Sequence, residues 1–203
     1  MNISIGGMMG SGKSFITGMI KKNLDMRYIQ SVVLEADKIF KSDICYNPLF
    51  IKKAQQLTNN NAYIKNGDEL VYNKDFFKEN LFTDLQFYKD YNRLIEPFLS
   101  GMLIELFNKI PKMNYIVELA VPTPSIMGLC DYNISVFSND EIAQARVKKR
   151  NPEYSYQYIK TVRKFQNSLH DKRLADFYFD NCSDEMPEHD LNWCVGLFTG
   201  ESN

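Results

Sequence analysis

Short apolar runs alternate along the chain with longer segments of helical periodicity. The runs predict buried strands, and they lie at residues 2–5, 31–34, 115–119, 134–137 and, in a shorter form, 177–179. The clearest helical segment spans about residues 89–109, where apolar side chains recur three and four positions apart and Pro97 predicts a kink. Strands that alternate with helices predict an α/β fold around a parallel sheet of about five strands.

Two segments depart from this alternation. Residues 47–80 are polar and rich in Asn and Lys, yet aromatic side chains recur within them, which predicts a helical insertion with loops. The last twenty residues contain Pro187, Gly196 and Gly200 and predict a weakly structured tail. The length of 203 residues fits one domain, and 44% hydrophobic residues suffice for a core.

Composition limits the partners of the protein. Because the formal net charge is −1, we expect no broad cationic surface and therefore neither nucleic acid nor an acidic membrane as a partner. No window of about 18 apolar residues predicts a membrane span, and the first residues predict a strand rather than an export signal. The four cysteines are far apart and the two histidines lack the spacing of metal ligands, which predicts reduced thiols and a cytoplasmic protein.

A glycine-rich loop follows the first predicted strand. In the stretch "ISIGGMMGSGKSF", Gly7, Gly12, Lys13 and Ser14 satisfy the P-loop pattern G-x-x-x-x-G-K-[ST], and a helical segment follows. Glycines let successive N–H groups point at phosphate oxygens, and the helix adds its positive end. Lys13 would bridge the terminal phosphates and Ser14 would bind Mg²⁺; the alternative is a glycine-rich turn with an incidental lysine. We expect a nucleotide to contact Gly7, Met9, Gly10, Ser11, Gly12, Lys13, Ser14 and Phe15.

A P-loop alone fits a GTPase, a motor ATPase or a small-molecule kinase. A GTPase would need an N-K-x-D segment, which the chain lacks, and a motor would need paired acids after a strand, where "IVELA" offers only Glu118. Glu35 and Asp37 instead follow the second predicted strand. Ligands of parallel α/β sheets gather at the carboxyl ends of the strands, so these two carboxylates favour the kinase.

Several further segments resemble the dephospho-CoA kinase family. The family patterns T-G-G-x-x-x-G-K-S and D-A-D correspond here to "IGGMMGSGKS" and "EAD". Further correspondences, in chain order, are residues 66–82, 91–99 and 143–150, Gln166, and residues 172–181. The resemblance implies a three-layer P-loop kinase fold. It also implies an assignment of segments: a core of residues 1–44, 112–140 and 175–203, a helical acceptor-binding insertion at 45–111 and a helical lid at 141–174.

The same resemblance implies roles for individual residues. Asp37 takes the position of the family's general base, although a carboxylate there could also cap a helix. Arg146 and Arg150 take the positions of the lid arginines, although a basic helical run is often only a solvated face. Asn181 would approach the adenine of ATP, or serve only as a turn residue. Glu35 replaces an aspartate of the family.

Departures from the family concentrate on the acceptor side. The family's Asp-Arg pair is Asn73 and Lys74 here, and its His-Pro pair begins with Glu96. The family's P-L-L-[FY]-E segment is reduced to "VPTPSIM" at residues 121–127, without the glutamate. We therefore expect Lys74 and Glu96, together with Glu35 and Asp37, to bind the acceptor, through contacts that differ from those of the family.

Three functions remain open at this point. The first is an ATP- and Mg²⁺-dependent kinase that phosphorylates the ribose 3′-hydroxyl of dephospho-CoA. The second is a kinase of the same fold that acts on a nucleoside or deoxynucleoside monophosphate. The third is a nucleotide-binding protein without catalysis, against which the joint retention of Lys13, Ser14, Asp37 and Arg150 argues. The expected partner is a small molecule, and the expected state is a monomer or a weak homo-oligomer.

Overall fold

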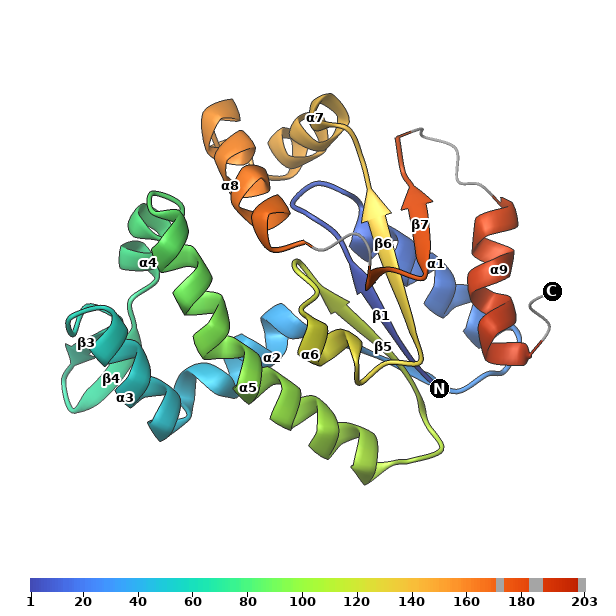
Figure 1. Ribbon diagram of the computed structural model, residues 1–203, viewed down its shortest axis with the longest axis horizontal. Helices are drawn as coiled ribbons and strands as arrows, with labels where there is room; N and C mark the ends of the chain where they lie inside the picture. The colour runs from blue at the N-terminus through green and yellow to red at the C-terminus, as the bar shows by residue number, and fades with distance from the viewer. Residues whose placement is uncertain (171–173, 183–187, 201–203) are drawn as a thin grey trace.

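A computed structural model describes residues 1–170, 174–182 and 188–200 of the chain. Its centre is a parallel sheet of five strands in the order β2-β5-β1-β6-β7 (Figure 1). The strands are β1 (Asn2–Gly6), β2 (Ser31–Glu35), β5 (Asn114–Leu119), β6 (Tyr132–Phe137) and β7 (Phe177–Asp180). All five coincide with the apolar runs, so the predicted α/β class and parallel sheet are confirmed.

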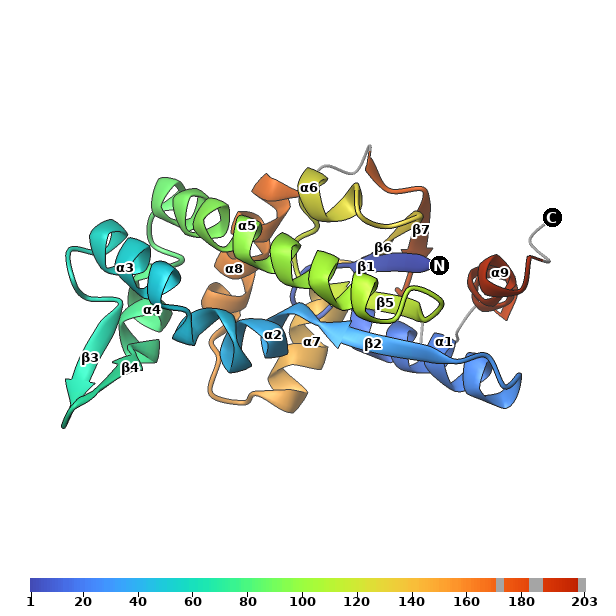
Figure 2. The same cartoon turned by 90° about the horizontal axis from the view of Figure 1, so that it is seen from below.

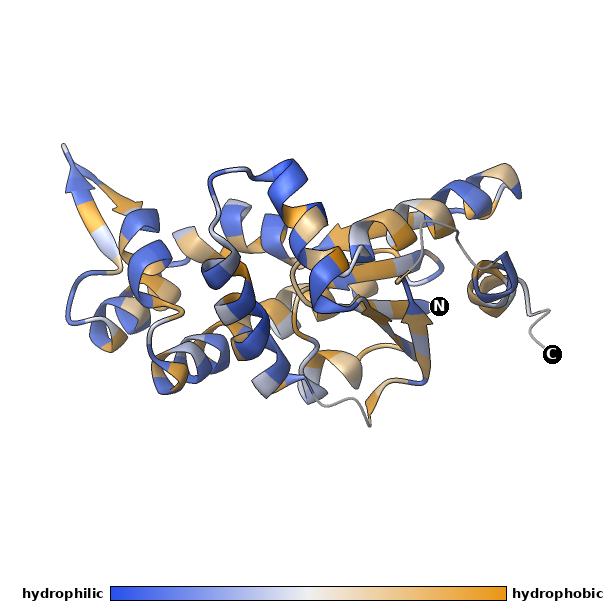
Figure 3. Cartoon of the chain, turned by 90° about the horizontal axis from the view of Figure 1, so that it is seen from above, coloured by the Kyte–Doolittle hydropathy of each residue, from blue (hydrophilic) through white to orange (hydrophobic). Residues whose placement is uncertain are grey.

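Helices cover both faces of this sheet. On one face α1 (Lys13–Met26) and α9 (Glu188–Thr199) enclose a core that includes Ile5 and Ile116. On the other face α2 (Ala36–Ser42), α5 (Leu85–Lys109) and α6 (Pro124–Met127) pack over Val117 and Leu119. Because both faces are covered, the strands are largely apolar, and Figure 3 colours them mostly hydrophobic. The three-layer arrangement is therefore confirmed.

The C-terminal segment corrects one prediction. The last twenty residues were expected to form a weakly structured tail, but residues 188–199 form α9. This helix packs against α1 and buries Leu191, Cys194 and Val195 in the core of that face. Gly196 lies inside the helix and is buried too, so tertiary packing outweighs the low helix propensity of glycine. The remainder of that prediction, at residues 184–187 and 201–203, lies outside the described residues.

The segment between β2 and β5 extends to one side of the sheet. It holds a 3-10 helix (Ile44–Tyr46) and the helices α3 (Pro48–Leu57), α4 (Lys74–Asn80) and α5, which continues as one α-helix through Pro97. It also holds an antiparallel hairpin of β3 (Tyr63–Asn66) and β4 (Glu69–Tyr72), which the sequence analysis did not predict. The hairpin projects at the far end of the molecule (Figure 2). The segment is thus helical with one hairpin rather than wholly helical.

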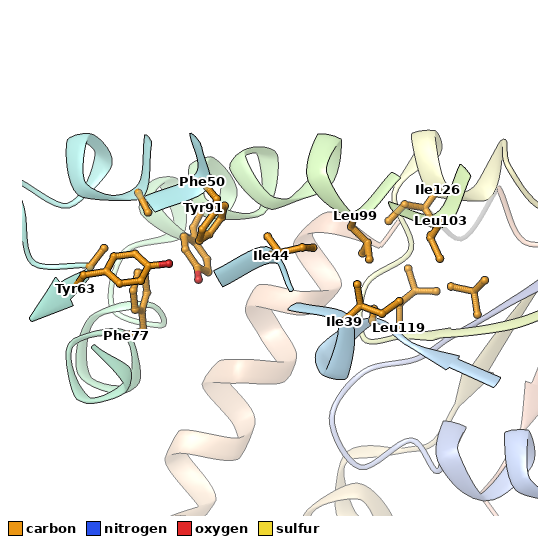
Figure 4. Close-up of a cluster of buried hydrophobic side chains, with 14 residues drawn as sticks. Ile39, Ile44, Phe50, Tyr63, Phe77, Tyr91, Leu99, Leu103, Leu119 and Ile126 are labelled. Carbon is orange, nitrogen blue, oxygen red and sulfur yellow. The ribbon is translucent and has the colours of Figure 1, made fainter. Parts of the chain in front are cut away.

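An aromatic core joins this segment to the sheet. Figure 4 shows one cluster of buried side chains that runs from Leu119 of β5, past Leu103 of α5, to Phe77 and Tyr63 at the hairpin end. The rings of Tyr72 and Phe77 stack at a centroid distance of 4.8 Å. Because the core is continuous, the segment and the sheet are packed as one body. The predicted boundaries of core, insertion and lid remain predictions, and residues 171–173 of the lid span lie outside the described residues.

The four cysteines are free thiols, as predicted, and burial sets their reactivity. Burial, assisted by Asp131 and Asp190 respectively, raises the pKa of Cys130 and of Cys194 to about 12. Because the unfolded thiol has a pKa of about 8.5, the folded state keeps these protons more tightly. The contribution of each thiol to the stability of the folded protein is complete below the pKa that the thiol has in the unfolded chain. It is lost as the pH rises from that value toward the pKa in the folded protein.

Cys130 and Cys194 are therefore expected to resist iodoacetamide at about pH 8 in the folded protein and to react fully in denaturant, since only the thiolate is nucleophilic. Mass spectrometry of the alkylated protein measures this directly. Cys182, whose pKa is raised first by a hydrogen bond with Asp180 and only then by burial, serves as the internal comparison. Rapid alkylation of Cys130 and Cys194 without unfolding would contradict the burial described here.

None of the described helices is both long and apolar enough to cross a membrane.

Candidate active site

The glycine-rich loop connects β1 to α1 and depends on glycine at two positions. Gly10 and Gly12 have φ angles of +77° and +87°, in the left-handed region that favours glycine. A Cβ atom on Gly12 would also lie 2.0 Å from Nδ2 of Asn181, and one on Gly10 would lie 2.6 Å from the carbonyl oxygen of Ala143. Gly12 caps α1 and has no side chain to satisfy the first free N–H groups of the helix. The loop therefore offers those groups to an anion.

A cavity of about 300 Å³ opens over this loop. It brings together most of the residues that the sequence analysis assigned to nucleotide binding and catalysis, from the loop, from α2 and from α7 (Asp140–Arg150). The predicted residues that line it are Met9, Gly10, Gly12, Lys13, Ser14, Phe15, Asp37, Arg146 and Arg150. Three cations against one carboxylate make the lining positive, which suits a polyphosphate.

Other predicted site residues lie elsewhere. Glu35 accepts a hydrogen bond from Nζ of Lys38 at 2.5 Å, and neither it nor the acceptor-side candidates Lys74 and Glu96 lines the cavity. Lys74 begins α4 and Glu96 lies within α5, on the segment that extends from the sheet. Gly7 and Ser11 belong to the loop but do not line the cavity. The structure thus brings Asp37 together with most of the residues assigned to nucleotide binding, and leaves the other acceptor-side residues outside the cavity.

Asn181 and Arg146 are joined by a hydrogen bond, whereas Arg150 is bound separately. The buried side chain of Asn181 donates from Nδ2 to the carbonyl oxygen of Ser11 at 2.9 Å, so its amide supports the glycine-rich loop. Nη1 of Arg146 donates to the carbonyl oxygen of Asn181 at 2.9 Å. Arg150 is exposed, and its Nε donates to Oδ1 of Asn151 at 3.0 Å. Since Arg146 and Arg150 lie four residues apart on α7, both face the cavity.

Glu118 is a site residue whose importance the sequence analysis missed. It lies at the carboxyl end of β5, level with Ile5 of β1, and its Oε1 accepts a hydrogen bond from Oγ of Ser14 at 2.5 Å. A serine hydroxyl and one carboxylate are typical ligands of Mg²⁺, which takes its remaining ligands from water and substrate phosphates. The donor set therefore fits Mg²⁺. No cluster of three or more His, Cys, Asp or Glu side chains that could hold a metal ion occurs in the described ranges.

Two residues of α8 (Tyr156–Leu169) form hydrogen bonds with the backbone of the glycine-rich loop. Arg163 is 4% exposed; it donates from Nη1 to the carbonyl oxygen of Met9 at 2.7 Å and from Nη2 to that of Ser138 at 2.8 Å. Its Nε donates to Asp140 at 2.7 Å. Oε1 of Gln166 accepts from the backbone N–H of Met9 at 2.7 Å. The sequence analysis gave neither residue a role, although Gln166 lay in a segment matching the family.

Solved structures share this architecture. TT1252 from Thermus thermophilus aligns with 100% of this chain and 98% of its own, at a TM-score of 0.68 and 16% identity. A dephospho-CoA kinase from Campylobacter jejuni aligns over 99% and 96%, at a TM-score of 0.53 and 16% identity. An APS kinase from Mycobacterium tuberculosis, solved with AMPPNP and APS, aligns over 98% and 96%, at a TM-score of 0.52 and 14% identity. No model of a protein family and no curated protein sequence matches the chain.

The chain has the P-loop kinase fold. At these identities the likeness establishes the fold and does not extend to the substrate. In this P-loop kinase fold the site lies at the carboxyl edge of the sheet: the glycine-rich loop follows β1, Asp37 follows β2, Glu118 is the last residue but one of β5, and Asn181 follows β7. Ligands of open parallel sheets bind outside this edge. The helices α7 and α8 lie beyond the same edge in Figure 1, and both contribute residues to the lining of the cavity.

Proposed function

We propose that the protein is an ATP- and Mg²⁺-dependent kinase that phosphorylates the ribose 3′-hydroxyl of dephospho-CoA to give coenzyme A. The observation that carries phosphoryl transfer is the single cavity in which Lys13, Ser14, Asp37, Arg146 and Arg150 meet. A phosphate-binding loop, a carboxylate and two arginines are the parts that transfer of a γ-phosphoryl group requires. The ordered sequence resemblance over residues 3–181 supports dephospho-CoA as the acceptor.

The loop would hold the phosphates of ATP and Lys13 would neutralise their charge. Free N–H groups at the start of α1 suit the phosphate oxygens, and the Lys13 ammonium suits the terminal phosphates. Ser14 and Glu118 would hold Mg²⁺, which supplies charge neutralisation on the phosphate oxygens. Arg150 and Arg146 approach from α7 and would stabilise the charge that spreads over the transferring group.

Asp37 would act as the general base. Its carboxylate is exposed to the cavity and has no ion-pair partner among the residues that the structure describes, so it is available to a substrate hydroxyl. As the 3′-oxygen attacks the γ-phosphorus, the bond from that phosphorus to the β-bridging oxygen breaks and ADP leaves. The proton of the hydroxyl passes to Asp37. We place this reaction in the cytoplasm, in keeping with four free thiols.

Replacing Glu118 with Gln is expected to raise the Mg²⁺ concentration needed for half-maximal turnover about tenfold, because an amide oxygen is neutral where the carboxylate is charged. The affinity for ATP measured without Mg²⁺ should stay the same. A titration of turnover against Mg²⁺ at saturating ATP measures the effect. Glu105→Gln, an exposed glutamate on α5, is the matched control. An unchanged Mg²⁺ requirement in Glu118→Gln would remove this residue from the metal site.

A nucleoside monophosphate is the second candidate acceptor. The observation in its favour is that Asn73, Lys74 and Glu96 stand where the dephospho-CoA kinase pattern has other residues on the acceptor side. ATP consumption measured with dephospho-CoA beside a panel of nucleoside and deoxynucleoside monophosphates separates the two candidates. We expect turnover with dephospho-CoA. Turnover with a monophosphate alone would overturn that acceptor, and ATP binding without turnover on any acceptor would favour a non-catalytic nucleotide-binding protein.

A further inference from the structure

Arg163 is a buried arginine on α8 whose side chain joins two parts of the site. All three of its nitrogen atoms donate hydrogen bonds. One goes to the carbonyl oxygen of Met9 in the glycine-rich loop, at 2.7 Å. The other two reach the segment that begins α7, at the carbonyl oxygen of Ser138 and the carboxylate of Asp140, at 2.8 and 2.7 Å. One planar guanidinium group therefore holds the loop and the start of α7 in a fixed relation.

Two further contacts lie at the same junction between the loop and α7. Oγ of Ser138, a fully buried residue, donates to the carbonyl oxygen of Gly10 at 3.3 Å. Gly10 also packs against the backbone of Ala143 in the first turn of α7, since a Cβ atom added to the glycine would lie 2.9 Å from Cα of Ala143. No side chain separates the two backbones here, so a shift of α7 acts directly on the loop.

Stability alone does not explain a buried arginine at this junction. A buried ion pair contributes little net stability, because taking two charges out of water costs about as much as their attraction returns. The side chain of Asp140 is also 60% exposed, so water weakens its attraction for Arg163. The guanidinium group instead supplies donors in fixed directions, which a lysine with its single nitrogen cannot reproduce. Arg163 therefore contributes geometry at this junction.

Arg150 lies at the opposite end of the helix that Arg163 holds. It is the last residue of α7, and Asp140 is the first, so about 15 Å of helix separate them. A tilt of α7 at its start consequently displaces Arg150 more than any other residue of the helix. Arg146 is less sensitive, because its Nη1 also donates to the carbonyl oxygen of Asn181. A displacement of about 1 Å at a group that contacts the reacting atoms can lower turnover about 10²-fold.

We infer that Arg163 is a positioning residue for phosphoryl transfer: its guanidinium group fixes α7 against the glycine-rich loop and thereby places Arg150 at the transferring group. The effect on turnover rests on the proposed function, whereas the effect on α7 does not. Arg163→Lys keeps the charge but cannot hold three acceptors at once. The substitution should therefore loosen α7 from the loop and leave Arg150 itself present.

A double-mutant cycle with Arg150→Ala tests this placement, with kcat measured on dephospho-CoA. In the otherwise unaltered protein, Arg163→Lys is expected to lower kcat roughly tenfold to a hundredfold. In the Arg150→Ala background it should cost less than about threefold, because the group that it displaces has already been removed. Arg93→Lys is the matched control, since the side chain of Arg93 is 70% exposed on α5, and it should leave kcat unchanged.

Hydrogen exchange of the free protein, without nucleotide or acceptor, gives a second measurement that does not depend on activity. Amides of α7 should exchange about tenfold faster or more in Arg163→Lys, because hydrogen bonds of a charged group are lost, while those of β5 stay unchanged. Asp140→Asn, at an exposed position, removes the charge from one of the three contacts and should raise exchange in α7 to a smaller extent. This variant provides the measurement if Arg163→Lys does not fold.

Three results would overturn the inference. Equal losses of kcat in the two backgrounds would mean that Arg163 acts independently of Arg150. Unchanged exchange in α7 would mean that Arg163 does not hold this helix. Equally faster exchange in α7 and β5 would mean that it supports the fold as a whole. If the unaltered protein does not phosphorylate dephospho-CoA but α7 alone exchanges faster in Arg163→Lys, the proposed function fails and the role of Arg163 in holding α7 stands.

Discussion

Replacing Asp37 with Asn is expected to lower kcat roughly 10²-fold or more and to leave the Kd of ATP nearly unchanged. The substitution keeps the size of the side chain and removes its ability to take a proton. Asp37 is exposed to the cavity and lies in the first turn of α2, so the fold does not depend on its charge. Steady-state kinetics for kcat and calorimetry for the Kd of ATP measure the two quantities separately.

Asp25→Asn is the matched control for this substitution. Asp25 lies on α1, away from the cavity, and pairs with Lys21 on the helix surface. Its replacement removes the same charge and should change kcat by less than twofold, because exposed ion pairs contribute little to stability. Equal kcat values for Asp37→Asn and the unaltered protein would remove Asp37 from the mechanism.

Replacing Arg150 with Ala is expected to lower kcat by roughly 10²- to 10³-fold, the usual cost of losing one group that stabilises transition-state charge. Only Nε of Arg150 is bound, to Asn151, so within the described part of the chain its terminal nitrogens are available to a phosphoryl group. The Kd of ATP should rise far less than kcat falls, since that charge develops mainly in the transition state.

Lys149 offers a close comparison for Arg150. It is the preceding residue on α7, carries the same charge and does not line the cavity. Lys149→Ala should therefore retain nearly full turnover. If Lys149→Ala and Arg150→Ala lose activity equally, the effect comes from the net charge of α7 and not from a contact of Arg150.

The sequence predicted the sheet and the phosphate-binding loop because both are local patterns. Each strand is a contiguous apolar run, and the loop is defined by eight neighbouring residues from Gly7 to Ser14. Asp37 was found for a similar reason, since it follows a strand at the edge where ligands gather. The hairpin of β3 and β4 was missed although Gly67 and Asp68 form its two-residue turn, with glycine at the first position and a φ angle of +63° there, a recognised hairpin signal. The polar residues around this turn do not show the apolar alternation that is typical of strands.

Features that depend on distant contacts could not be predicted in this way. The helix α9 is stabilised by packing against α1, more than 160 residues earlier in the chain. The sequence around α9, with Pro187 before it and Gly196 within it, does not indicate this packing. Arg163 and Gln166 reach Met9 across sequence separations of 154 and 157 residues. Glu118 was judged only against the paired acids of a motor ATPase, although its strand lies beside β1 and places it against Ser14.

The central claim is that this cavity transfers the γ-phosphoryl group of ATP to the 3′-hydroxyl of dephospho-CoA. Phosphorus NMR of the products formed from ATP, Mg²⁺ and dephospho-CoA tests it most directly. We predict a new phosphomonoester resonance of coenzyme A that grows in step with ADP and is nearly absent with Asp37→Asn. ADP formed without that resonance, or the resonance formed equally by Asp37→Asn, would contradict the claim.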